Sequence, residues 1–107
     1  MIPGTTPTFT LSIKNGTEYL ADTANVRVDI RQQDVLISKE MKDLTINLEN
    51  NTITFVLTQK ESLKFLYKKG NMEFQVCGIL NDGTVWRTYV VEVPVEKILS
   101  NEVLKNE

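Results

Sequence analysis

An all-β fold with two packed antiparallel sheets is the fold class that this sequence predicts. Apolar and polar residues alternate along several short segments, which is typical of strands that bury one face. Turn-forming pairs such as Asn-Asn, Asp-Gly and Gly-Asn lie between those segments, as they do in hairpins. The length of 107 residues favours one domain with a single core. These observations predict a two-sheet sandwich, with a small closed β-barrel as the alternative.

Four strands follow directly from the alternation. In each segment, apolar side chains occupy every second position and include the β-branched and aromatic types that pleated sheets favour. One face of each segment is therefore predicted to lie in the core. The predicted inward residues are Phe9, Leu11 and Ile13; Val26, Val28 and Ile30; Leu44, Ile46 and Leu48; and Ile53, Phe55 and Leu57.

The turns between neighbouring strands set two predicted registers. A two-residue loop at 32–33 joins the strand at 26–31 to a short strand, VLISKE, at 35–40. A two-residue loop at 50–51 is favoured because asparagine tolerates the positive φ that such loops need. Both registers place apolar side chains opposite each other, and a one-residue slip would turn them out of the core. The predicted inward pairs are Ile30 with Val35, Val28 with Ile37, Leu48 with Ile53 and Ile46 with Phe55.

The last hairpin, which contains QVCGILNDGTVWRTYV at 75–90, allows two registers. With a two-residue loop at 82–83, Trp86 faces Ile79 on the outer side of the sheet. With a three-residue loop whose Gly83 has positive φ, Trp86 lies beside Gly78 on the inner side. The first register is preferred because it buries more of the apolar residues together. It also pairs Phe74 with Val91, Met72 with Val93 and Glu73 with Glu92.

The segment TQKESLKFL breaks the alternation and is predicted to connect the two sheets. Thr58 followed three residues later by Glu61 matches a capping box, which indicates one helical turn. Leu63 and Leu66 are then expected to close that end of the core. The sequence at 68–71 is predicted to turn the chain into the next strand.

Pro94 is expected to end the last strand, because proline cannot donate to the hydrogen-bond ladder. Residues 1–94 therefore form the predicted sandwich domain, and residues 95–107 a short, partly helical tail. Sequential hairpins with one crossover are typical of an immunoglobulin-like sandwich. The chain lacks the Cys–Trp–Cys core of antibody domains, so the likeness is to the broad class.

Composition argues against most catalytic and metal-binding chemistry. The chain has no histidine, the commonest general base and metal ligand, and one cysteine, Cys77. A cysteine nucleophile needs a base, and a structural zinc site needs more ligands than the chain offers. Four acids that could be considered for catalysis are expected to be solvated surface charges: Glu18, Asp22, Asp29 and Asp34. We therefore expect no enzyme activity, no catalytic or metal-binding residue, no cofactor and no small-molecule substrate.

Charge and hydropathy give no reason to expect nucleic acid or membrane as partners. The net charge is −2, which provides no electrostatic attraction for a phosphate backbone. No stretch approaches the ~18 apolar residues of a membrane span. The first residues, MIPGTTPTFTLSIKNG, show no pattern of a signal peptide.

An outward apolar patch is the functional feature that the preferred register predicts. In that register Trp86, Ile79 and Val90 share the outer face, and such patches usually mark interfaces. Tryptophan is also enriched at the energetic centres of interfaces. The tail residues Ile98 and Leu99 either belong to the same partner-binding surface or fold back to cover it.

The order of elements resembles a known family. The segments GTTPTFTLSI, ANVRVDIRQ, VLISKE, LTINLENNTITFVLTQKESLKF and NMEFQVCGILNDGTVWRTYVVEVPV, with a final EKIL, span roughly residues 4 to 99. They are similar to small proteins encoded among tail genes of phages and prophages of Gram-positive bacteria. The layout is also similar to the N-terminal domain of phage baseplate upper proteins, although this chain has no long helical or receptor-binding extension.

The resemblance implies a β-sandwich with a structural, non-catalytic role. It implies attachment to other tail or baseplate proteins or to copies of the same chain, in a virion component made in the bacterial cytoplasm. Two other functions fit the sequence: a stand-alone interaction module, such as a phage-encoded inhibitor of a host protein, and a carbohydrate-binding module. The resemblance brings no catalytic residues with it.

Overall fold

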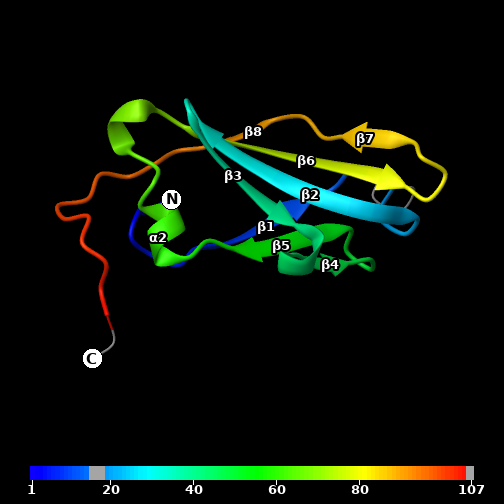
Figure 1. The fold of residues 1–107 in the computed structure, drawn as a ribbon, viewed down its shortest axis with the longest axis horizontal. Coiled ribbons are helices and arrows are strands. Elements are labelled where there is room, and N and C mark those ends of the chain that lie inside the picture. The colour runs from blue at the N-terminus through cyan, green and yellow to red at the C-terminus, as the bar shows by residue number, and fades with distance from the viewer. Residues whose placement is uncertain (15–18, 106–107) are drawn as a thin grey trace.

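The computed structural model describes residues 1–14 and 19–105, which form two antiparallel sheets packed face to face (Figure 1). The three-stranded sheet has the order β1 (Thr8–Ser12), β5 (Thr52–Val56), β4 (Thr45–Asn47). The five-stranded sheet has the order β3 (Val35–Glu40), β2 (Thr23–Gln32), β6 (Met72–Leu80), β7 (Val85–Arg87), and β8 (Val91–Val93) also pairs with β6. Because neither sheet closes on itself, the predicted sandwich is confirmed and the alternative of a closed barrel is wrong.

The strand order is that of an immunoglobulin-like sandwich. β1-β5-β4 corresponds to strands B, E and D of that fold, and β3-β2-β6-β7 corresponds to C′, C, F and G. Within the described residues, no strand corresponds to strand A on the free side of β1. The sheet that contains β1 is therefore three strands wide, whereas the facing sheet is four strands wide, because β7 and β8 pair with different parts of the same strand, β6.

The core lies between the inner faces of the two sheets. Rings from facing sheets meet at its centre: Phe9 of β1 lies edge-to-face against Phe74 of β6, with ring centroids 4.8 Å apart. Phe55 of β5 packs on both rings, at 5.5 and 5.9 Å. Most of the predicted inward residues are buried, namely Ile13, Val26, Val28, Ile30, Ile53, Phe55 and Leu57.

The turn between β2 and β3 lies one residue later than predicted. Its loop residues are Gln33 and Asp34, so Ile30 faces Ile37 and not Val35. The reason is Gln32, which is buried and bonded to the crossover and therefore cannot serve as a loop residue. The shift moves the pairing by two residues, which leaves every side chain on its predicted face.

The turn between β4 and β5 is also longer than predicted. It spans residues 48–51, so Ile46 faces Ile53 and not Phe55. The side-chain oxygen of Asn47 accepts hydrogen bonds from the backbone N–H groups of Glu49 and Asn50, which starts the turn early. Leu48, predicted to lie inside, is consequently exposed in the loop.

The crossover between the sheets begins with the predicted helical turn, α2 (Gln59–Ser62). Thr58 Oγ1 accepts from Glu61 N–H at 3.1 Å, and Glu61 Oε1 accepts from Thr58 N–H at 2.8 Å, which confirms the capping box. Lys39 Nζ on β3 donates to both carboxylate oxygens of Glu61, at 2.8 and 3.0 Å. Phe65 is the side chain fully buried at this end, whereas Leu63 and Leu66 are only half-buried.

A buried glutamine fastens the rest of the crossover to the five-stranded sheet. Gln32 Nε2 donates to the carbonyl oxygens of Leu66 and Gly70, at 2.7 and 2.8 Å. Its Oε1 accepts from the N–H of Leu66 at 2.8 Å. These bonds bracket the short 3-10 turn η2 (Tyr67–Lys69), and a similar turn, η1 (Met41–Asp43), links β3 to β4.

The tail leaves the sandwich beside α2. The last strand ends at Val93, before Pro94, as predicted. The described tail residues, 95–105, contain no helix, so the expected partly helical structure is wrong for this part. Gln59 of α2 holds the extended tail through Leu104, whose carbonyl accepts from Gln59 Nε2 at 2.9 Å and whose N–H donates to Gln59 Oε1. Figure 1 shows the tail at the end of the molecule opposite β7.

Candidate interaction surface

The last hairpin adopts the register with the three-residue loop. Gly78 faces Trp86, and Ile79 faces Val85. The loop is closed by hydrogen bonds from Leu80 N–H to Thr84 O at 2.8 Å and from Gly83 N–H to Leu80 O at 2.9 Å, and Gly83 has φ +91°. The preferred two-residue loop was therefore wrong for this part of the hairpin, and the alternative is correct.

Trp86 consequently lies inside the sandwich. Only 7% of the residue is exposed, and its ring stacks on Tyr19 with centroids 5.5 Å apart. The indole lies directly over Gly78, where a Cβ atom would come within 2.5 Å of Cζ2. Glycine thus makes the space that the indole occupies, and the expected outward placement of Trp86 is wrong.

A β-bulge restores the predicted register further along the same edge. Phe74 faces Val91 and Glu73 faces Glu92, as the sequence predicted. The extra residue is absorbed within 88–90, since these three residues span only Gln75 and Val76 of β6 between the pairs Cys77–Arg87 and Phe74–Val91.

Thr88 fixes this bulge through three hydrogen bonds. Its N–H donates to Val76 O at 2.9 Å, while its Oγ1 accepts from Val76 N–H at 3.0 Å. Its carbonyl oxygen accepts from Gln75 Nε2 at 3.0 Å. The threonine side chain therefore replaces a backbone carbonyl in the ladder, and the next residue, Tyr89, is exposed to solvent.

The bulged edge carries a cluster of exposed apolar side chains. Tyr89 is 93% exposed, and Val90 and Val91 are each about half exposed. Val85 on β7 is also exposed. We call Val85, Arg87, Tyr89, Val90, Val91 and Glu92 the edge surface. It replaces the Trp86 patch as the candidate interaction site.

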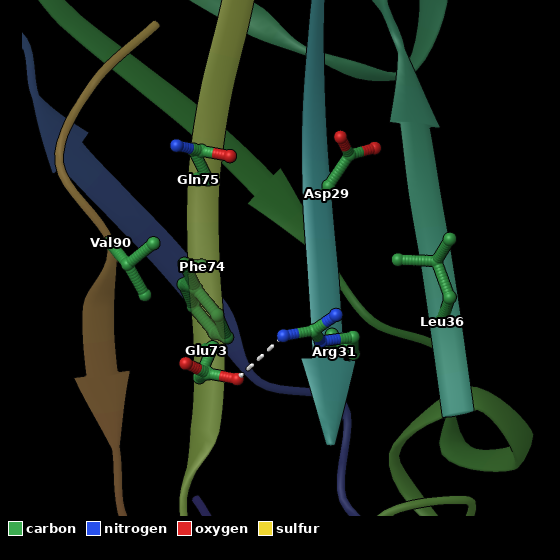
Figure 2. Close-up of a pocket in the computed structure, with 7 residues that line it drawn as sticks. All are labelled: Asp29, Arg31, Leu36, Glu73, Phe74, Gln75 and Val90. Atoms are coloured by element: carbon green, nitrogen blue, oxygen red, sulfur yellow. Dashed lines mark hydrogen bonds and ion pairs between the residues drawn. The ribbon is translucent and has the colours of Figure 1, made fainter. Parts of the chain in front are cut away.

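A shallow hollow of about 230 Å³ adjoins the edge surface on the outer face of the five-stranded sheet. Figure 2 shows Val90 on one side of it and Leu36 of β3 on the other. Between them, Arg31 of β2 forms an ion pair with Glu73 of β6, with Nη2 and Oε1 3.5 Å apart. Glu73 thus has a cation partner on its own sheet.

The structure separates the five residues predicted to bind a partner. Ile79 is partly exposed on the outer face of β6, and Val90 is half exposed at the bulge. Ile98 and Leu99 line a groove beside Leu66 and Tyr67 of the crossover, at the other end of the molecule. The tail therefore does not cover Ile79 or Val90. Sequence reasoning missed Tyr89, because the two-residue loop placed it opposite Val76 on the inner face and the alternation around it gives no sign of the bulge.

The acids considered for catalysis lie in surface contacts. Asp29 pairs with Arg27 at 2.9 Å and accepts from Ser38 Oγ at 2.7 Å. Asp34 lies 3.6 Å from Lys69 Nζ, and Asp22 Oδ1 accepts from Asn81 Nδ2 at 3.0 Å. The fourth acid, Glu18, lies outside the described residues.

The single cysteine lies on the outer side of the five-stranded sheet. Cys77 is a free, buried thiol that lies opposite Arg27 on β2 and Arg87 on β7. No group of three or more potential metal-ligating side chains occurs in residues 1–14 and 19–105. Nor does that part of the chain form a helix long and apolar enough to cross a lipid bilayer.

The chain matches no protein-family model, and no curated protein is significantly similar to it.

Proposed function

We propose that this chain is a non-catalytic structural protein of a phage or prophage tail or baseplate, which acts by protein–protein contact. The likeness of its segments to small tail proteins motivates the tail or baseplate assignment. The observation that carries the contact role is Tyr89, a residue that is 93% exposed and is followed by two half-exposed valines. In this proposal the protein is made in the bacterial cytoplasm and becomes part of the virion.

Tyrosine in such a position suits a contact residue for physical reasons. Its large ring buries much apolar area on binding, while its hydroxyl can keep a hydrogen bond at the rim. Tyrosine is accordingly enriched among the residues that dominate binding energies. Exposed apolar clusters beside a polar sheet face also mark interfaces more often than chance.

The bulge presents Tyr89 from a rigid position. Thr88, directly before it, is held by three hydrogen bonds to Val76 and Gln75 of β6. A residue held on a fixed strand loses less conformational entropy on binding than one in a free loop. The edge surface therefore combines exposure with preorganisation.

Co-purification with virion proteins tests this proposal. We expect the chain to be detected by mass spectrometry in purified phage particles from the source strain. We also expect immobilised protein to capture a tail or baseplate protein, and Tyr89→Ala to weaken that capture about 30-fold, as the loss of about 2 kcal/mol at a hot spot implies.

Tyr67→Ala is the matched control. Tyr67 is also exposed, but it lies on η2 at the opposite end of the molecule. Equal capture by the Tyr89 and Tyr67 variants would remove the edge surface from the proposal. Absence of the chain from virions, with capture of a host protein only, would favour the inhibitor function.

A further inference from the structure

Two charged side chains of the edge surface have no ion-pair partner among the described residues. They are Arg87 on β7 and Glu92 on β8, and both are exposed. Other charges on the same sheet face are paired, as Arg27 with Asp29 and Arg31 with Glu73 show. The edge surface therefore carries one free cation and one free anion.

Glu92 lies in a place that favours a cation from outside. It faces Glu73 directly across the β6–β8 pair, and like charges in that arrangement repel. Arg31 and Lys69 line the same hollow as Glu92, but Arg31 pairs with Glu73 and Lys69 with Asp34. Glu92 itself makes no ion pair among the described residues. An arginine from another molecule would stabilise it.

The free charges are arranged symmetrically about the apolar centre of the edge. Arg87 and Glu92 are five positions apart, about 16 Å along an extended chain. The midpoint between them falls between Tyr89 and Val90. A second copy related by a two-fold rotation about this midpoint would run antiparallel to the first. Arg87 of each chain would then lie opposite Glu92 of the other, which makes two such pairs.

The unequal widths of the two sheets leave this edge accessible. β6 faces β1 across the core, as the contact between Phe74 and Phe9 shows. β7 and β8 lie beyond β6 and therefore project past the described edge of the three-stranded sheet. This explains why Val91, which shares the inner side with Phe74, stays half exposed. A second molecule can approach the projecting edge without meeting β1.

We propose that the edge surface binds a second copy of this chain through a two-fold contact. Arg87 of each copy pairs with Glu92 of the other, and the Tyr89 and Val90 side chains of both copies pack at the centre. This inference rests on the proposed function, because it names the partner of the same surface. The bulge interrupts the edge, so the contact is made by side chains and not by a continuous backbone ladder.

The size of the surface sets the expected strength. The edge surface offers six residues on each side, whereas stable complexes use about 20–30 residues a side. Association is therefore weak in dilute solution, with a Kd on the order of 0.1 mM, and weakens further as salt screens the two ion pairs. A high local concentration of the chain in an assembly would increase the fraction of dimers.

Charge reversal with rescue is the decisive experiment. Sedimentation equilibrium up to about 1 mM protein at about 0.05 M salt should show wild-type dimers. Arg87→Glu and Glu92→Arg should each weaken dimerisation about tenfold, because each breaks both ion pairs. The double variant, which exchanges the two charges, should restore it. Lys60→Glu and Glu49→Arg, on exposed positions of α2 and the β4–β5 turn, are the matched charge controls and should dimerise like wild type.

The outcomes separate this inference from the proposed function. Single reversals that dimerise as well as the controls, or a double variant that stays as weak as the singles, would overturn the two-fold contact. A strictly monomeric protein that still captures a virion protein through Tyr89 would overturn the inference and leave the function standing. Restored dimerisation in the double variant supports the contact whether or not a virion protein is captured.

Discussion

At the scale of single residues, the pairing of Gly78 with Trp86 decides which way the last hairpin faces. The indole fills the space that a Cβ at position 78 would occupy, so the two residues fit only as a pair. This fit, together with the stacking on Tyr19, stabilises the inward placement of Trp86. The cost is an indole Nε1 that is buried without a hydrogen-bond partner among the described residues.

Gly78→Ala tests the pairing. The added Cβ would lie 2.5 to 2.7 Å from three indole atoms, so we expect a loss of about 1–3 kcal/mol in the free energy of unfolding, measured in urea. In a Trp86→Leu background the same substitution should cost little, because a smaller side chain leaves room. An equal cost in both backgrounds would contradict the pairing.

At the scale of elements, the crossover and its contacts hold the two sheets in their relative positions. α2 is fixed by its capping box and by the Lys39–Glu61 ion pair, and the following turn is fixed by Gln32. The capping box is encoded by local sequence, because Thr58 and Glu61 are three residues apart. The Lys39–Glu61 ion pair and the Gln32 hydrogen bonds depend on strands that are far away in the sequence.

Gln32→Leu should destabilise the fold although leucine has a similar volume. It leaves the N–H of Leu66 and the carbonyls of Leu66 and Gly70 without their partner. We expect a loss of about 3 kcal/mol in unfolding free energy, since each unsatisfied buried group costs about 1–3 kcal/mol. Gln33→Leu is the control, because the exposed Gln33 side chain makes one long bond of 3.3 Å to Lys69 O. Similar losses for both variants would show that Gln32 does not fasten the crossover.

The Glu61 contact predicts a pH dependence of stability. Burial raises the pKa of Glu61, but hydrogen bonds from Lys39 and Thr58 outweigh it and hold the pKa below the ordinary value of 4.5. A lowered folded pKa contributes stability above the unfolded pKa, and that contribution is lost as pH falls through the folded pKa. The difference in unfolding free energy between wild type and Glu61→Gln should therefore be largest near neutral pH.

Chemical denaturation at pH 7 and at about pH 3 measures this change. Glutamine can still accept from Thr58, so the variant isolates the charge from the cap. The exposed Glu49→Gln serves as the control and should show no such trend. A wild-type advantage that stays constant down to the lower pH would contradict the prediction.

At the scale of the whole molecule, the mismatch between a three-strand and a five-strand sheet creates the edge surface. Where the narrower sheet ends at β1, the wider one continues with β7 and β8. Trp86 on β7 is covered by Tyr19, but Val91 on the inner side of β8 has no strand facing it and stays half exposed. Tyr89 and Val90 are also exposed along this edge, so all three are free to meet a partner. The surface proposed to bind a second copy is thus a consequence of the topology.

The sequence by itself determined the strands, the face that each buries except in β7, the capping box and the end of β8 at Pro94. These features depend on the alternation of apolar and polar residues and on neighbours within a few positions. They can therefore be read directly from the sequence. The position of the loop at 33–34 and the length of the loop at 48–51 differ from the prediction. Each difference moves the strand pairing by two residues, so the paired strands keep their predicted inner faces.

Only the tertiary structure decided the register at Trp86, the bulge at Thr88 and the exposure of Tyr89. Both hairpin registers satisfied the local pattern, so the choice between them depended on Gly78 making room for the indole and on Tyr19 stacking against it. The bulge then required Thr88 to bond across the ladder to Val76. Such fits are set by volumes and hydrogen bonds between strands, and a one-dimensional pattern does not contain them.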